Sequence, residues 1–220
     1  MFSPKMLQLI GTGILETFYM TLGSTFMAYV FGLPLGLILV ISDPAGIHPM
    51  PTLNKVLGTI VNLLRSVPFL ILLMALIPTT RKIVGTSIGS TAMIPPLIIA
   101  AFPFVARMVE SSVKEVDAGV IEAAQSMGAS TFQIVCKVLL PEAKPSLLMG
   151  AAIATTTILG YSAMAGIVGG GGLGAIAINY GYYRTQTNIL WVMVVFLSLI
   201  VQLFQTLGEK AARAVDKRVR

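Results

Sequence analysis

Long apolar runs alternate with short polar breaks along nearly the whole chain. Each run approaches or exceeds the roughly 18 apolar residues typical of a membrane-spanning helix. The predicted spans are residues 17–41, 55–77, 88–106, 145–168 and 187–208. Glu16 interrupts the first apolar run, so residues 6–15 are predicted to form an interfacial or flanking turn before the first span. The pattern predicts an all-α polytopic membrane protein with five transmembrane helices.

The polar breaks contain residues that helix interiors tolerate poorly. Asp43-Pro44-Ala45-Gly46 follows the first span, Pro78-Thr79-Thr80-Arg81-Lys82 follows the second, and the glycine-rich stretch 169–184 precedes the last. Proline removes a helical hydrogen bond and glycine favours turns, so we expect loops at these places. The remaining break, residues 107–144, is far longer. We treat residues 1–220 as a single transmembrane domain.

Composition supports a membrane protein. Hydrophobic residues make up 55% of the chain and charged residues 11%, whereas a soluble domain carries about 25% charged residues. The net charge of +6 needs no nucleic-acid partner, because basic residues at membrane edges set orientation and meet anionic lipid. A single cysteine, Cys136, allows no internal disulfide bond.

The distribution of Lys and Arg predicts the orientation. With the N-terminus outside, the inner side carries one basic residue in the first loop, four in the 107–144 loop and five in the C-terminal tail, ten in all, and the outer side carries four. The opposite orientation reverses this ratio and conflicts with the positive-inside rule. We therefore expect the 107–144 loop and the C-terminus to be cytoplasmic.

The sequence contains no recognisable energy source of its own. None of its nine acidic residues lies in the middle of a predicted span, although ion-coupled carriers usually keep an ionisable group at membrane depth. Arg65 is the one charge inside a span; it could hold an anionic group or tie helices together through backbone carbonyls, but it is a poor proton relay.

Nucleotide-binding, catalytic and metal-binding motifs are also missing from the sequence. The run Gly169–Gly174 has no following Lys-Ser/Thr and no preceding strand, so it predicts a flexible turn or close helix packing rather than a phosphate-binding loop. We predict no catalytic residue, no metal ligand and no cofactor in this chain.

The 107–144 segment predicts two short helices joined by a tight turn. Asp117 is a suitable N-cap for the first helix, and Gly128 lies where a left-handed C-terminal cap falls. Ser130 with Gln133 forms a capping-box pattern that starts the second helix, and Pro141 disrupts the continuation of that helix.

The spacing of apolar residues gives each of these helices one apolar face. These faces consist of Val116, Val120, Ala123/Ala124 and Met127 in the first helix, and Phe132, Cys136 and Leu139 in the second. The small pair Ala123-Ala124 allows another surface to approach the backbone closely, and Glu122 offers a charge for an Arg or Lys of a partner. A merely interfacial helical hairpin is the alternative interpretation.

Three motifs resemble those of a known family. Glu122-Ala123-Ala124, then Gly128, Ile134 and Leu140-Pro141, resembles the cytoplasmic-loop signature of bacterial ABC-importer permeases. Arg65-Ser66-Val67-Pro68 is similar to an element of the amino-acid importer permeases. Gly160–Gly166, followed by the glycine run, resembles the fourth-span region of the methionine-uptake branch.

This resemblance implies a type I ABC importer permease fold in the bacterial inner membrane. It implies a homodimer of this chain in contact with membrane lipid, two separate ATPase subunits that bind the ATP and Mg, and an extracytoplasmic substrate-binding protein. The cargo it implies is methionine, with D-methionine as a further candidate. Another small amino acid, a methionine-containing dipeptide, an ion-coupled carrier and a channel are the alternatives.

The resemblance also implies roles for individual residues. Glu122, Ala123, Ala124 and Gly128 are the predicted ATPase-coupling residues. Tyr161, Ser162 and Met164 are candidates for the translocation path, with ordinary helix packing as the alternative.

Overall fold

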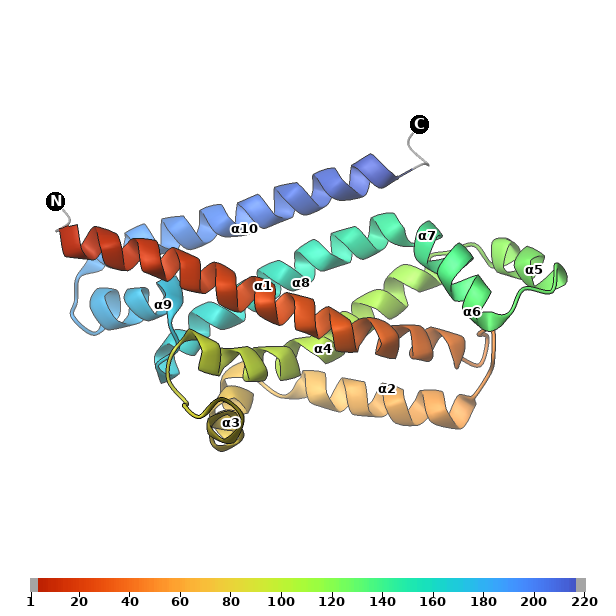
Figure 1. The fold of residues 1–220 in the computed structure, drawn as a ribbon, viewed down its shortest axis with the longest axis horizontal. Coiled ribbons are helices and arrows are strands. Elements are labelled where there is room, and N and C mark those ends of the chain that lie inside the picture. The colour runs from red at the N-terminus through yellow and green to blue at the C-terminus, as the bar shows by residue number, and fades with distance from the viewer. Residues whose placement is uncertain (1–3, 217–220) are drawn as a thin grey trace. The chain divides into compact units, whose positions relative to one another are not determined.

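The computed structural model describes residues 4–216, which form helices joined by turns and bends (Figure 1). The α-helices are α1 (Pro4–Ile41), α2 (Pro51–Ser66), α3 (Phe69–Val84), α4 (Ser90–Lys114), α5 (Ala118–Ser126), α6 (Thr131–Ile134), α7 (Leu140–Glu142), α8 (Lys144–Ala165), α9 (Gly172–Ile176) and α10 (Thr187–Val215). π-Helical turns cover Val135–Leu139 and Ala177–Tyr182, and a 3-10 turn covers Gly166–Val168. The predicted all-α class is confirmed. Three basic residues of the tail, Lys217, Arg218 and Arg220, lie outside the described residues.

Four helices of the described chain are long and apolar enough to cross a membrane: Pro4–Ile41, Ser90–Lys114, Lys144–Val168 and Thr187–Val215. The pair α2 and α3 passes the same test only when taken together, and the number is five if this pair is counted as one broken span. The predicted span over residues 55–77 falls on this pair, whose helix ends at Ser66 and restarts at Phe69. Pro68 explains the break, since proline has no N–H and pushes the residue before it out of helical geometry.

Three predicted breaks are helical in the structure. Residues 6–15 belong to α1, so the predicted flanking turn is wrong. Pro78–Lys82 lies inside α3, which continues to a left-handed cap at Gly85. The stretch 169–184, predicted to be a loop, contains α9 and the π-helical turn that follows it.

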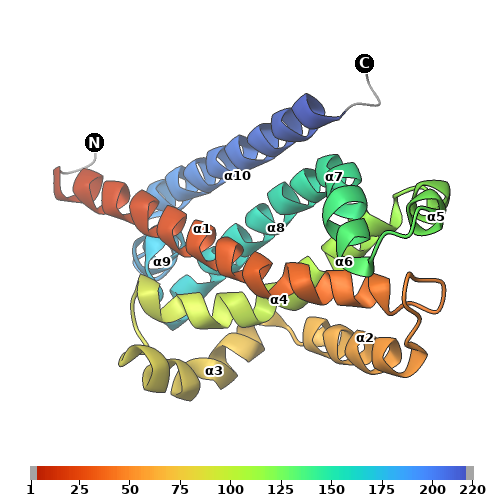
Figure 2. The same ribbon diagram turned by 45° about the vertical axis from the view of Figure 1, so that its right-hand side comes forward.

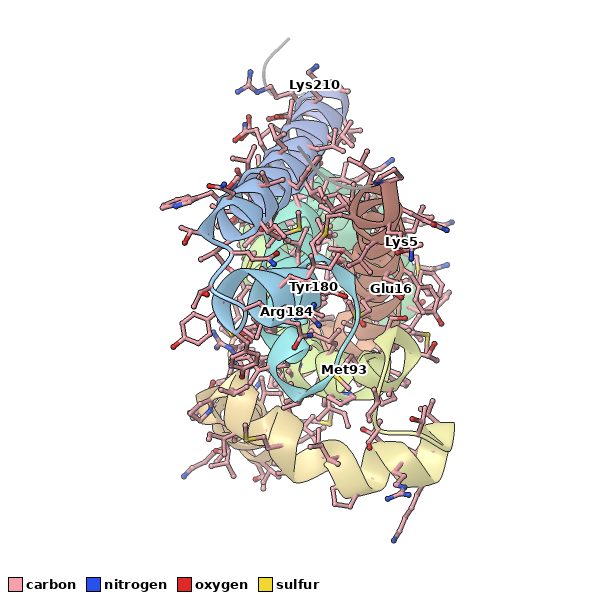
Figure 3. All side chains as sticks on the ribbon, turned by 90° about the vertical axis from the view of Figure 1, so that its left-hand side faces the viewer. Lys5, Glu16, Met93, Tyr180, Arg184 and Lys210 are labelled. Atoms are coloured by element: carbon pink, nitrogen blue, oxygen red, sulfur yellow. The ribbon has the colours of Figure 1, made fainter. Side chains whose placement is uncertain are left out.

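α1 continues through Glu16, and the carboxylate of Glu16 has a hydrogen-bond partner at the end of another helix. Its Oε2 accepts a hydrogen bond of 2.6 Å from the backbone N–H of Gly172, the first residue of α9. Thr17 Oγ1 accepts the next backbone N–H, that of Leu173, at 2.9 Å. Glu16, labelled in Figure 3, thus satisfies a donor that a helix N-terminus leaves unpaired. A carboxylate within an apolar run was therefore compatible with a continuous helix.

The described residues divide into two compact units. The first unit takes those up to Met27, Val67–Ala101 and Thr155–Gln205; the second takes Ala28–Ser66, Phe102–Ala154 and those from Thr206 on. The core of the first unit joins residues of α1, α8, α9 and α10, together with the π-helical turn after α9. Its buried members are Ile10, Leu159, Leu173, Ile176, Ala177, Ile189, Met193 and Ile200.

Close backbone packing joins α1 and α4 within the second unit. Gly32 and Gly36 are one helical turn apart on α1, and their Cα atoms face Val105 and Val109 of α4. A Cβ on Gly32 would lie 2.8 Å from the carbonyl oxygen of Phe102. Two small residues at this spacing let membrane helices approach without side chains between them.

We expect Gly36→Val to destabilise the protein by about 1–3 kcal/mol, because the added side chain forces α1 away from α4. The matched control is Gly11→Val in the same helix, where nothing lies within 4 Å of an added Cβ. Thermal unfolding of the purified protein in detergent would measure both. Equal losses in the two variants would contradict the assigned packing.

Candidate functional site

The first helix of the predicted hairpin, α5, begins and ends as its sequence indicates. Asp117 is the N-cap and accepts a 2.7 Å hydrogen bond from the backbone N–H of Gly119. Gly128 follows the helix with φ +77° in the left-handed region, and its N–H donates to the carbonyl of Gln125 at 2.9 Å. Both predicted caps of α5 are confirmed. They close the turn with backbone bonds, so the direction of the next helix is fixed locally.

The second helix of the hairpin begins with the predicted capping box. Ser130 Oγ accepts the N–H of Gln133 at 3.4 Å, and Gln133 Oε1 accepts the N–H of Ser130 at 2.8 Å. The prediction that Pro141 disrupts this helix is only partly right. A π-helical turn over Val135–Leu139 widens the helix just before Pro141, and one further α-turn follows. The wider turn makes room for a proline that cannot donate, so the chain stays helical up to Glu142.

The hairpin of α5 and α6 (Figure 2) carries the predicted coupling residues, and only part of this set is exposed. Glu122, Ala123 and Gly128 are exposed, while Ala124 is 4% exposed. Ala124 therefore anchors α5 against its own chain, and only Ala123 of the small pair can meet another surface. This limits the predicted close approach to one side of α5.

Two side chains of the predicted apolar faces are exposed beside the turn. Met127 is 81% exposed and Phe132 is 76% exposed. Val116 and Leu139, predicted on the same faces, are buried. Periodicity identified the apolar residues but not which of them remain uncovered. Exposed apolar side chains on the same hairpin as the exposed Glu122 give it the composition of an interaction surface.

A hollow separates α5 from the loop after α1. This cavity has a volume of about 480 Å³ and is lined by α5 residues, including Ile121 and Glu122, and by Asp43 and Lys114. All of these residues belong to the second unit. The hairpin thus packs on this unit with open space on the side of Glu122.

A chain of charges ties three elements of the second unit together. Lys114 Nζ donates to Asp43 Oδ2 at 2.8 Å and to Glu110 Oε1 at 2.9 Å. Arg107 donates to Glu110 Oε2 at 2.6 Å and to the carbonyl of Gly58 at 3.0 Å. Alternating charges on α4 therefore join the loop after α1, through Asp43, and α2, through the carbonyl of Gly58. The sequence did not reveal these two contacts, because Asp43 and Gly58 are far from α4 in the chain.

The candidate path residues behave differently from one another. The ring of Tyr161 stacks on Phe69, with centroids 4.4 Å apart and an interplanar angle of 8°. Met164 is 48% exposed. Ser162 is 1% exposed and its hydroxyl donates to the carbonyl of Leu159 at 2.8 Å. Ser162 is thus buried and its hydroxyl is bonded within α8, whereas Met164 is open to the surroundings.

Phe69 is a partner that the sequence analysis missed. It is the first residue of α3, directly after Pro68, and it is buried. A proline followed by a large aromatic residue is the only sequence signal for this contact, and it does not indicate Tyr161. Stacking of this kind contributes about 0.5–1.5 kcal/mol beyond the area it buries.

Tyr180 and Arg184 form another aromatic contact, beyond α9. The guanidinium of Arg184 lies 4.4 Å from the ring centroid of Tyr180 (Figure 3). Arg184 is exposed. The ring keeps this cation near the π-helical turn while its donors remain in contact with solvent.

Arg65 lies in the last turn of α2 and is exposed. Its guanidinium carbon lies 6.0 Å from the ring centroid of Phe104, and none of the ion pairs among residues 4–216 includes it. The predicted alternative was that Arg65 ties helices together through backbone carbonyls. Within residues 4–216 the structure shows no hydrogen bond from Arg65 to a backbone carbonyl.

Membrane-spanning helices with an exposed capped hairpin define a multi-pass membrane component that has a surface for a partner. Residues 32–220 match the family described as "Binding-protein-dependent transport system inner membrane component". The chain belongs to this family and is a multi-pass transport subunit of the inner membrane.

Curated relatives cover most of the chain. It is 50% identical over 210 residues to the "Probable D-methionine transport system permease protein MetI" of Vibrio cholerae, covering 96% of this chain and 93% of the relative. It is 49% identical over 164 residues to the "D-methionine transport system permease protein MetI" of Escherichia coli K12, covering 74% and 76%.

Solved structures share the fold. A chain of the inward-facing MetNI methionine ABC transporter matches with a TM-score of 0.96 and 46% identity, covering 98% of this chain and 100% of that one. The predicted type I ABC importer permease fold is confirmed. An amino-acid ABC transporter crystallised with histidines matches at 23% identity and a TM-score of 0.67, a likeness of fold alone.

The pair Asp43–Lys114 predicts a pH effect on stability. The hydrogen bond from Lys114 and that from the N–H of Ala45 lower the pKa of Asp43 below its usual value of 3.8. A carboxylate with a lowered folded-state pKa stabilises the fold above its unfolded pKa, and this contribution is lost as the pH falls through the folded pKa. Asp43→Asn should therefore lower the melting temperature at pH 7, and its difference from the wild type should shrink below about pH 4.

Thermal unfolding of the two proteins between pH 7 and pH 3 measures this difference. Glu115→Gln is the control, because Glu115 is an exposed acid in none of the ion pairs of the described residues. A difference between Asp43→Asn and the wild type that does not change with pH would contradict the assigned ion pair.

Proposed function

We propose that this chain is the membrane permease of an ATP-driven importer of methionine, including D-methionine. The observation that carries the proposal is likeness along almost the whole chain, at 50% identity over 210 residues, to a relative named as a D-methionine permease. The same chain matches MetNI, named as a methionine ABC transporter, at a TM-score of 0.96. Another small amino acid or a methionine-containing dipeptide remains the second candidate cargo.

In this proposal two copies of the chain pair and the path runs between them. Each copy docks a separate ATPase subunit, which binds the ATP and Mg, and the chain itself is not an enzyme. A homodimer suits a chain with five spans, because closed two-fold assemblies are the commonest oligomers. A substrate-binding protein on the outer side delivers the cargo, in keeping with the family's description.

The charge count orients the chain in the proposal. The N-terminus is outside, and the hairpin of α5 and α6 lies in the cytoplasm with the C-terminus, since ten basic residues then lie inside and four outside. This places Glu122, Met127 and Phe132 where a cytoplasmic ATPase can reach them. A hairpin with exposed apolar side chains and an exposed carboxylate suits a partner groove that has both apolar walls and a basic residue.

ATP drives the proposed cycle through the hairpin. When the ATPase subunits close on ATP they displace α5, and the permease changes between inward-open and outward-open states. Nucleotide can bias such an equilibrium only through contacts that differ between the two states. The rigid caps at Asp117 and Gly128 support this role, because a hairpin with fixed geometry transmits a displacement.

Co-purification tests the class of transporter. We expect the tagged permease to bring down its ATPase subunit in equal amounts, and the reconstituted complex with its binding protein to take up labelled methionine only with ATP. Uptake that survives removal of the ATPase and falls with an uncoupler would indicate an ion-coupled carrier instead. Competition by D-methionine, other amino acids and short methionine peptides distinguishes the cargoes.

Gly128→Val should uncouple ATP hydrolysis from uptake while leaving the complex partly assembled. A β-branched residue in the left-handed region costs on the order of 1–2 kcal/mol and misplaces the hairpin. Gly85→Val is a matched control, since Gly85 also has a positive φ, of +85°, and lies at the end of α3. The measurement is methionine taken up per ATP hydrolysed; a normal ratio in Gly128→Val would disprove the assigned role.

A further inference from the structure

The exposed surface of α2 has two faces of different chemistry. The apolar face consists of Leu53, Val56, Ile60 and Leu63, all exposed. The polar face, here called the α2 polar stripe, consists of Lys55, Thr59, Asn62 and Ser66, which are also exposed. The spacing of the stripe places its members on one side of the helix for almost its whole length.

A stripe of this kind is suited to water rather than to lipid. The two hydroxyls bond within the helix, Thr59 to the carbonyl of Lys55 at 2.7 Å and Ser66 to that of Asn62 at 2.8 Å. Lys55 and Asn62 have polar groups that such bonds do not cover. Within the hydrocarbon these groups are costly, and in membrane proteins they face the bundle interior or a water-filled cavity. Since α2 is half of a broken span, the stripe fits the wall of an aqueous path.

Asn62 is held so that its donor end is available. Arg107 Nη2 donates to Asn62 Oδ1 at 3.0 Å, which occupies the amide oxygen. The amide nitrogen, which carries two N–H donors, has no recorded partner within residues 4–216. The charge of Arg107 is itself offset by Glu110 at 2.6 Å. Asn62 thus presents its N–H donors, and the charge of the neighbouring Arg107 is already neutralised by Glu110.

Arg65 adds an uncompensated cation one helical turn further along. Its guanidinium leans on Phe104 at 6.0 Å and is exposed. α2 contains no Asp or Glu, so nothing on its own helix neutralises this charge. Residues three apart on a helix are neighbours. Asn62 and Arg65 together present N–H donors and one positive charge, an arrangement complementary to a carboxylate.

We propose that Asn62 and Arg65 bind the carboxylate of the amino-acid cargo within the path, and that the α2 polar stripe is the aqueous wall leading to them. The proposal rests on the proposed function and extends it to the residues that recognise the cargo. Arginine pairs with a carboxylate through two parallel hydrogen bonds, and the amide of Asn62 adds a third donor.

Thiol labelling tests the aqueous wall in the assembled transporter. With the exposed Cys136 changed to Ser, Thr59→Cys should react with charged methanethiosulfonate reagents several-fold faster than Ile60→Cys, its neighbour on the apolar face. The anionic reagent should outpace the cationic one at Thr59→Cys. Arg65→Gln should lower that preference, whereas Arg81→Gln, an exposed cation of α3, should not. A purely structural Arg65 would leave the preference unchanged.

Uptake tests the carboxylate site itself. In proteoliposomes that contain the ATPase and the binding protein, Arg65→Gln should reduce methionine uptake per ATP by about tenfold, as expected for loss of a charge-assisted hydrogen bond. Arg65→Lys should restore part of it, and Asn62→Leu should reduce it as well.

Three results would overturn the proposal: equal labelling of Thr59→Cys and Ile60→Cys, a reagent preference unaffected by Arg65→Gln, or an Arg65→Gln uptake equal to that of Arg81→Gln. If the wild-type transporter instead took up no methionine, the proposed function would fail. The labelling result would then still report the aqueous wall independently.

Discussion

Charge within an apolar chain is the constraint on which the rest of this structure depends. A charged side chain at membrane depth must find a partner or face water, because neither lipid nor an apolar core stabilises it. Glu16 meets the requirement at the first N–H of α9, and Glu110 meets it between Arg107 and Lys114. These bonds fix the elements of each unit, since moving any of them would leave a charge unpaired. Arg65 has no such bond within residues 4–216, and it is the charge that we propose binds the cargo.

The hairpin follows a different physical rule from the spans. Its geometry is set by local backbone bonds: an Asp cap, a left-handed glycine and a reciprocal capping box. Its attachment comes from buried side chains, Ala124 in α5 and Ile134 in α6. A hairpin anchored in this way is displaced together with the helices on which it packs. That property suits a part of the molecule that receives force from a separate subunit.

Predictions from the sequence were reliable where the cause was local. Asp117, Gly128 and Ser130 each act within a few residues, so their caps could be read directly and are confirmed. Predictions about exposure were less reliable. Met127 and Phe132 were assigned to apolar faces and are exposed, and Ser162, a candidate for the path, is buried. Periodicity reports which side of a helix is apolar, but what covers that side is decided by elements far away in the chain.

The sequence alone determined the membrane class, the helical fold and the ends of the α5–α6 hairpin, because hydropathy, composition and capping are properties of neighbouring residues. The family came from the resemblance of short motifs. Only the tertiary structure decided that α1 continues through Glu16, that the second span breaks at Pro68, and that Asn62 turns its amide oxygen to Arg107. Each of these depends on a partner, or on the balance between a local preference and a distant contact. The sequence shows that a buried charge needs a partner and that a proline lacks an N–H donor. Only the folded chain shows which residue becomes the partner and where the helix breaks.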